Sequence, residues 1–118
     1  MDSASNILEE VKKQNGISND VFEFDSDILS LINGAFFTLN QIGVGPEIPF
    51  TVSEDTIFSD FSTQLPFEIL LNYLVLKTKI VFDPPTNSQI IEAYKDRIAE
   101  LEFRMNLLVD NGGGFVNG

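Results

Sequence analysis

The sequence predicts an all-α protein, a small four-helix bundle with an irregular loop between the second and third helices. Four segments carry apolar residues at helical spacing. Two of these helices run into residues that end a helix, Gly43-Val44-Gly45-Pro46 and Asp83-Pro84-Pro85. Hydrophobic residues make up 43% of the 118 positions and include eleven phenylalanines, which is enough for one core and too much for a disordered chain.

The first two helices are predicted at residues 5–13 and 26–42. Asn15 and Gly16 end the first helix. Asp25 is expected to cap the second helix, whose main apolar positions are spaced 4, 3, 4 and 3 residues apart. These positions are Ile28, Ile32, Ala35, Leu39 and Ile42. Further apolar residues widen the stripe, so this helix should lie centrally or offer one face to a neighbouring subunit.

Residues 43–65 form the expected irregular loop. Phe50 and Val52 alternate with polar residues, which favours a short extended piece. Ser53 is predicted to cap one helical turn that carries Phe58.

The third helix is predicted to begin at Pro66, which suits the first helical position, and to end at Phe82. Because its first half is almost entirely apolar, we expect it to be the central and most buried helix. Asp83, Pro84 and Pro85 then form a structural corner, since proline cannot continue the helix and restricts the residue before it. This corner should fix the angle between the third and fourth helices.

The fourth helix is predicted to follow a cap cluster at residues 86–88 and to run to Val109. Its apolar residues alternate in steps of three and four, as in an ordinary amphipathic core helix. They are Ile91, Tyr94, Ile98, Leu101, Met105 and Leu108. Residues 1–110 therefore form one helical domain, and the glycine-rich residues 111–118 are expected to be a flexible tail.

The charge of the chain is strongly acidic, with a formal net charge of −11. Residues 1–68 hold twelve of the eighteen acidic residues and two of the seven basic ones. Binding to DNA phosphates requires lysine and arginine, so direct DNA binding is an improbable main role. The surplus of acid serves solubility or keeps the surface away from nucleic acid.

Residue types needed for common catalysis are missing from the sequence. The chain has no cysteine and no histidine, which excludes a thiol nucleophile, a histidine base and the usual zinc sites. The carboxylates at 20, 23, 25 and 27 do not follow the calcium-loop pattern. Gly112-Gly113-Gly114 lacks the lysine of a phosphate-binding loop. We therefore expect no catalytic residues, no metal, no cofactor and no enzymatic activity.

The N-terminal residues do not form the apolar core of a signal peptide, and the longest apolar run, residues 69–76, is too short to span a membrane. We therefore expect a soluble intracellular protein with no membrane contact.

Four stretches, in this order along the chain, resemble the head–tail connector (head-completion adaptor) family of tailed bacteriophages. They are Asp27-Ile28-Leu29-Ser30-Leu31-Ile32-Asn33 leading into Phe36-Phe37-Thr38-Leu39-Asn40-Gln41-Ile42-Gly43-Val44-Gly45; Phe50-Thr51-Val52 followed by Phe58-Ser59-Asp60-Phe61; Tyr73-Leu74-Val75-Leu76-Lys77 to Phe82-Asp83-Pro84-Pro85; and Glu100-Leu101-Glu102-Phe103-Arg104-Met105-Asn106. One departure is Phe58, where many relatives carry tryptophan.

The resemblance implies a structural protein of the virion neck, present in the host cytoplasm during assembly. Its copies would form a homo-oligomeric ring, commonly twelve-fold, beneath the portal protein. The ring would extend the DNA channel and support the next neck or tail-completion protein. An acidic lumen would let DNA pass without specific binding. The resemblance brings no catalytic residues.

Two groups of residues are candidates for contacts with these partners. The tail carries apolar residues beyond a glycine hinge, so Gly112, Gly113, Gly114, Phe115 and Val116 are predicted to order on the portal. The irregular loop is predicted to contact a neighbouring subunit or the tail side through Val44, Ile48, Phe50 and Phe58. The alternatives are a small acidic DNA mimic that inhibits a DNA-processing partner and, less favoured, a carboxylate-metal enzyme.

Overall fold

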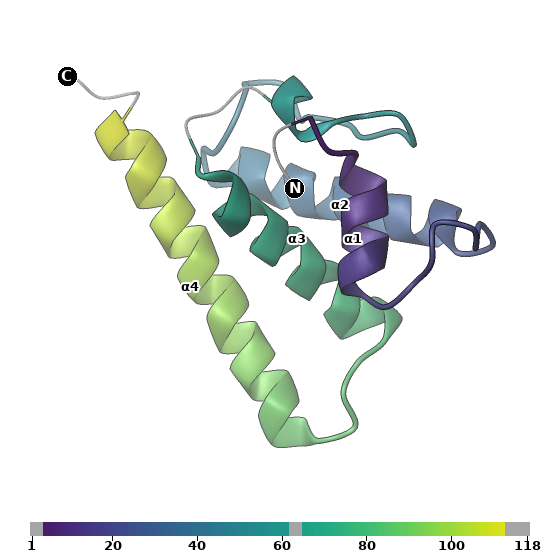
Figure 1. Cartoon of the computed structure of the whole chain (residues 1–118). Coiled ribbons are helices and arrows are strands. Elements are labelled where there is room, and N and C mark those ends of the chain that lie inside the picture. The colour runs from purple at the N-terminus through teal and green to yellow at the C-terminus, as the bar shows by residue number, and fades with distance from the viewer. Residues whose placement is uncertain (1–3, 62–64, 113–118) are drawn as a thin grey trace.

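The computed structural model describes residues 4–61 and 65–112, with side chains as far as residue 109. Four α-helices follow one another: α1 (Ile7–Gln14), α2 (Asp25–Gln41), α3 (Phe67–Phe82) and α4 (Ser88–Gly112). A 3₁₀ turn, η1 (Phe58–Asp60), lies between α2 and α3 (Figure 1). These described ranges contain no strand, only one isolated bridge between Asn6 and Ile57. The predicted all-α fold with an irregular loop is confirmed.

The helix α3 occupies the centre of the fold, as the sequence predicts. It packs against α1, α2 and α4, which surround it in Figure 1. Tyr73 and Leu74 on α3 are fully buried, and the apolar faces of α1 and α2 close over them. Burial of this continuous apolar surface is the main force that holds the four helices together.

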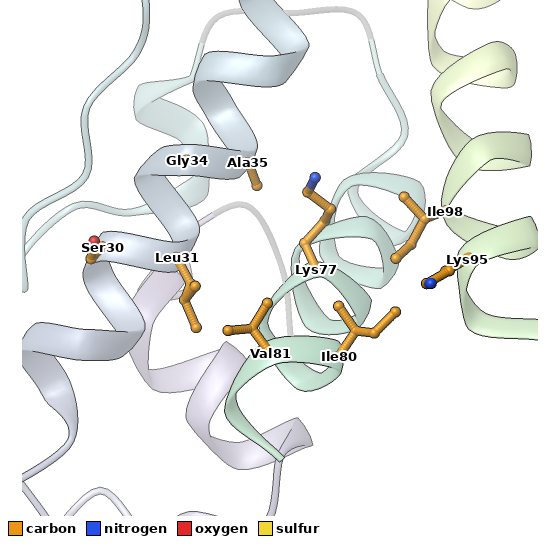
Figure 2. Close-up of a pocket in the computed structure, with 9 residues that line it drawn as sticks. All are labelled: Ser30, Leu31, Gly34, Ala35, Lys77, Ile80, Val81, Lys95 and Ile98. Atoms are coloured by element: carbon orange, nitrogen blue, oxygen red, sulfur yellow. The ribbon is translucent and has the colours of Figure 1, made fainter. Parts of the chain in front are cut away.

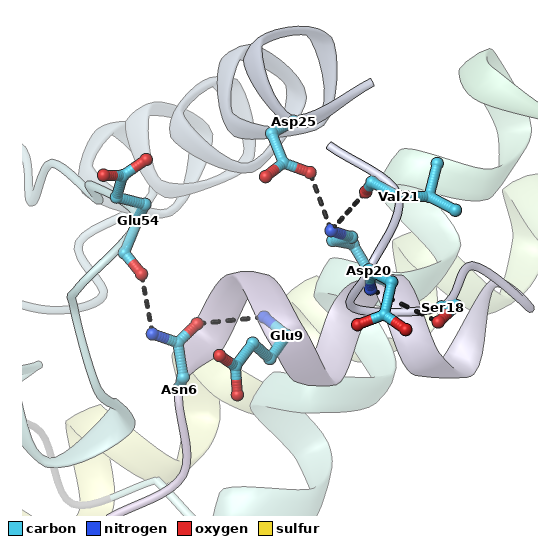
Figure 3. Close-up of polar contacts among 8 residues, drawn as sticks. Asn6, Glu9, Ser18, Asp20, Val21, Asp25 and Glu54 are labelled. Carbon is cyan, nitrogen blue, oxygen red and sulfur yellow. Dashed lines mark hydrogen bonds and ion pairs between the residues drawn. The ribbon is translucent and has the colours of Figure 1, made fainter. Parts of the chain in front are cut away.

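The connector between α1 and α2 is held by a buried ion pair. Lys12 is only 2% exposed, and its Nζ lies 2.8 Å from the Oδ1 atom of Asp25. The same ammonium donates a hydrogen bond to the carbonyl oxygen of Val21 at 2.7 Å (Figure 3). Asp25 was predicted as the N-cap of α2, and this is wrong. Phe24 occupies the cap position, because the carboxylate of Asp25 is engaged by Lys12.

The N-terminal cap of α1 ties the irregular loop to the first helix. The side chain of Asn6 accepts a hydrogen bond from the amide of Glu9 and donates one to the carbonyl oxygen of Glu54 (Figure 3). Ser53, predicted to cap the helical turn at Phe58, instead begins a separate turn. Its backbone N–H donates to the Oγ1 atom of Thr56 at 2.8 Å. The cap of η1 is provided by Asp60, whose carboxylate accepts the amide of Ile57.

Two asparagines of α2 hold the other side of the loop. Asn33 exchanges two hydrogen bonds with the backbone of Val52, at 2.6 and 3.1 Å. Asn40 donates to the carbonyl oxygens of Pro46 and Glu47. Residues 46–52 are therefore tied to α2 near both ends by asparagine side chains, which take the place there of the pairing a strand would have.

A cluster of three phenylalanines fills the space under the loop. The rings of Phe36, Phe50 and Phe61 lie 4.8–5.0 Å apart, centre to centre. Gly45 crosses over Phe61 with a φ angle of +99°, and a Cβ atom there would lie 2.8 Å from the ring. The position therefore requires glycine both for its backbone conformation and for the close approach.

The helix α4 packs along only part of its length. Leu101 and Met105 are buried, whereas Ile91 and Ile98 are half-buried and Leu108 is exposed. The predicted six-residue seam therefore has the right face but is covered only at its middle. Three ion pairs lie along the outer face of α4: Glu92–Lys95, Arg97–Glu100 and Glu100–Arg104.

Candidate functional site

The loop residues predicted to contact a neighbour differ in accessibility. Val44 and Phe58 are buried in the core of this chain, and Phe50 is half-buried in the phenylalanine cluster. Ile48, in contrast, is 79% exposed. Contact through Val44 or Phe58 would require these side chains to leave the core, so we retain Ile48 alone as the proposed contact of this loop.

The corner residues lie between α3 and α4, with polar caps on both sides. Asp83 follows the last residue of α3, and its backbone N–H donates to the carbonyl oxygen of Lys79 at 2.9 Å. Asn87 accepts the backbone N–H of Gln89 at 2.7 Å and so begins α4. Pro84 and Pro85 lie between these caps, where neither helix needs their missing N–H.

The tail residues predicted to bind the portal are described only at their start. Gly112 is the last residue of α4, so the helix continues beyond the predicted end at Val109 and beyond the expected domain boundary at 110. Gly113, Gly114, Phe115 and Val116 lie outside the described residues. Their contact with a portal stays a prediction.

A groove that the sequence did not predict runs between α2, α3 and the first half of α4. Its volume is about 450 Å³, which is sufficient for an aromatic side chain. Figure 2 shows apolar side chains converging on this space from the three helices. The groove is lined by Leu31, Gly34, Ala35, Ile80, Val81 and Ile98, with Ser30, Lys77 and Lys95 as its polar members.

One of the two lysines in the groove has no acidic partner. The Nζ atom of Lys95 lies 3.6 Å from the Oε2 atom of Glu92 on the same helix. Lys77 is half-buried, and its ammonium lies 5.8 Å from the centre of the Tyr73 ring, but it forms no ion pair with any carboxylate of the described residues. In a chain with eighteen acidic residues, this leaves an uncompensated positive charge beside an apolar surface.

The acidic residues near the start of α2 do not gather into a metal site. Asp25 is engaged by Lys12, and within the described part of the chain no three acidic side chains are placed to hold an ion. Asp20 and Glu23 are exposed on the connector and make no ion pair with a described residue. Phe22, which lies between them, is 71% exposed.

A further polar contact fixes the packed half of α4. The hydroxyl of Tyr73 donates to the Oε2 atom of Glu102 at 2.8 Å. Burial, together with this carboxylate, raises the pKa of the Tyr73 phenol far above its ordinary value. On the outer face, the Arg97 guanidinium lowers the pKa of Glu100. The Tyr73–Glu102 hydrogen bond ties α4 to α3, whereas the pairs of Glu100 stay within the exposed face of α4.

Comparison with known protein families shows that residues 7–112 match a family described as phage connector protein. The chain belongs to this family. The resemblance inferred from the four ordered stretches is therefore confirmed. Searches among curated proteins and among solved structures gave no match.

Family membership gives this protein a general role as a connector in the phage neck, with portal and tail proteins as the general class of partner. The family is a structural one. Within the described residues, no helix is both long and apolar enough to cross a membrane.

Proposed function

We propose that copies of this connector form a twelve-fold ring beneath the portal protein and that the ring joins the head to the next neck or tail-completion protein. The observation that carries the proposal is the family match, which spans nearly all described residues. A rigid body supports it, because α3 is surrounded and the loop is tied to both α1 and α2. Such a body can repeat around an axis without internal rearrangement.

The acidic surface suits a ring whose lumen carries DNA. Five of the seven basic residues are engaged in ion pairs within their own chain, so little free positive charge remains to hold phosphates. Acidic walls repel the DNA backbone and let it slide through without specific binding. The protein acts here as a structural part with no catalytic step, in the virion neck and, during assembly, in the host cytoplasm.

The test is electron cryo-microscopy of particles that carry this protein. The expected result is a ring of copies between the portal and the next neck component, on the axis along which DNA passes. Absence of the chain from particles, with recovery bound to a host nuclease or polymerase instead, would replace the proposal by the DNA-mimic alternative. The acidic charge is the observation that favours that alternative.

A pair of variants tests which residues contact the portal and which contact the tail side. Deletion of residues 112–118 removes the tail we assign to the portal, including Phe115 and Val116, and should abolish attachment to DNA-filled heads. The melting temperature should change little, because the core lies elsewhere. Ile48→Ser is the matched variant for the opposite end, and it should bind heads normally but join fewer tails. Wild-type head completion by the deletion variant would show that the portal contact lies outside the tail.

A further inference from the structure

The groove between α2, α3 and α4 has a complement elsewhere on the same chain. Its floor is apolar, and Lys77 beside that floor forms no ion pair with a carboxylate of residues 4–61 or 65–109. The connector presents Phe22, an exposed aromatic side chain, between the exposed carboxylates of Asp20 and Glu23. An aromatic ring flanked by acids is the chemistry that an apolar groove with a lysine would accept.

The two features lie on different flanks of α2. Phe22 borders α2 at Ser26, Leu29 and Asn33, whereas the groove is bordered by Leu31 and Gly34, and Ser30 lies at the edge of both. At 100° per residue these two sets are centred on different faces of α2. Figure 1 shows the connector that follows α1 on the side of the molecule opposite α4. The connector and the groove of one copy therefore face different directions, so each can meet an adjacent copy.

We infer that the groove receives the connector of the adjacent copy, with Phe22 inserted between Ile98 and Val81 and with Asp20 and Glu23 facing Lys77 and Lys95. The contact is head-to-tail, since it joins two different surfaces of identical chains. Contacts of this kind close into a ring when the rotation between copies is a simple fraction of a turn. This inference rests on the proposed ring and names the surfaces that build it.

The contact also explains why this acidic chain leaves Phe22 exposed. The Lys12 ammonium lies 5.3 Å from the centre of the Phe22 ring, which holds the ring near the surface without covering it. The ion pair between Lys12 and Asp25 stiffens the backbone on both sides. The ring is therefore presented in a fixed position, which lowers the entropy lost on insertion.

The natural absence of cysteine permits a direct test by crosslinking. The double variant Phe22→Cys/Ile98→Cys should, after mild oxidation of purified particles, give a ladder of covalent multimers that ends at the size of the ring. Each rung requires two chains, because Phe22 borders a different flank of α2 from the groove that Ile98 lines. The control Lys13→Cys/Ile98→Cys, which moves the first cysteine to an exposed site on α1, should give no ladder.

A charge exchange tests the electrostatic part and guards against a misfolded cysteine variant. Lys77→Glu should lower the number of copies per particle about tenfold, the effect of losing one partly buried ion pair at an interface. Adding Glu23→Lys to the same chain should restore incorporation, since the pair is then reversed. Lys13→Glu changes the net charge equally but lies outside the groove, and it should be incorporated normally.

The outcomes separate this inference from the proposed function. A ring seen in particles with no ladder from the double-cysteine variant and no rescue by Glu23→Lys would overturn the inference and leave the ring in place. Particles without any ring would overturn both. A ladder together with rescue would establish the contact.

Discussion

The two halves of α4 belong to one helix but are held in different ways. In the second half, Leu101 and Met105 are buried, Glu102 accepts the hydroxyl of Tyr73, and Asn106 donates to the carbonyl oxygen of Ile42 at 2.6 Å. In the first half, Ile98 is half-buried beside the groove, and Ile90 is exposed. Buried side chains and hydrogen bonds to the rest of the chain thus fix the second half. In the first half, the apolar side chains are only partly covered.

The difference separates residues that fold the chain from residues that remain available to partners. Apolar burial stabilises a fold in proportion to the area removed from water, so the second half contributes most of what α4 adds to stability. The first half keeps apolar residues that the fold covers only in part, and the second half also leaves Phe103, Leu107 and Leu108 exposed beside its buried residues. In a connector protein, such a surface is where another subunit can gain binding energy.

The largest expected effect is a contrast between one substitution in each half. Leu101→Ala should destabilise the protein by about 2–5 kcal/mol, since it leaves a cavity in the buried middle of the helix. Ile98→Ala should cost only about 1 kcal/mol, because that side chain is already half-exposed. Urea unfolding followed by circular dichroism measures both. Equal losses of stability would show that the two halves are packed alike.

The next largest loss of stability is expected at the corner between α3 and α4. Replacement of both Pro84 and Pro85 by alanine should destabilise the protein by about 1–3 kcal/mol, because the corner loses its fixed φ angles and α4 its direction. The first half of α4, nearest the corner, should move most. Thermal unfolding measures the loss, and hydrogen exchange locates it. Unchanged melting together with normal particle assembly would show that the caps at Asp83 and Asn87 suffice.

The ends of α2 and α3 could be predicted from the sequence, but the packing of α4 could not. Glycine and proline end α2 and α3 close to the predicted places, because their backbone preferences are local and need no partner. Periodicity also identifies the apolar face of α4. It cannot reveal how much of that face the chain itself covers, since this depends on where α2 and α3 end relative to α4. The groove was missed for that reason.

Side-chain capping was predicted less well, because capping residues have competing partners. Asp25 has the residue type of an N-cap, but Lys12, thirteen positions earlier, binds it instead. Asn33 and Asn40 were not singled out, although amides seven residues apart on an otherwise apolar helix lie on one face. That spacing, next to a loop without strands of its own, is a signal that could have located the loop along α2.

A smaller effect is expected from the hydrogen bond that joins α4 to the end of α2. Asn106→Ala should cost about 1 kcal/mol, since the carbonyl oxygen of Ile42 loses its donor in a partly buried place. Gln89→Ala in the first half is the control, because its exposed side chain has no comparable contact, and it should change stability by less than about 0.5 kcal/mol. The two variants are compared by urea unfolding at one pH. An equal or larger effect at Gln89 would contradict the contrast between the halves.

The smallest effect at neutral pH, and one that grows with alkali, concerns Tyr73. Its phenol has a folded-state pKa raised above the ordinary value of 10.0, first by burial and then by Glu102. The neutral phenol is therefore favoured by folding. Its contribution is fully present below pH 10 and is lost as pH rises above that value, where the unfolded chain releases the proton and the folded chain resists doing so.

Tyr73→Phe should consequently lose less stability than the wild type between neutral pH and pH 11. Tyr94→Phe, which removes the same hydroxyl from the half-exposed part of α4, should follow the wild type. Urea unfolding at a series of pH values measures the slopes. Parallel slopes for the wild type and Tyr73→Phe would show that the Tyr73–Glu102 contact opens before the protein unfolds, so that the second half of α4 is held by its apolar residues and by Asn106 without that contact.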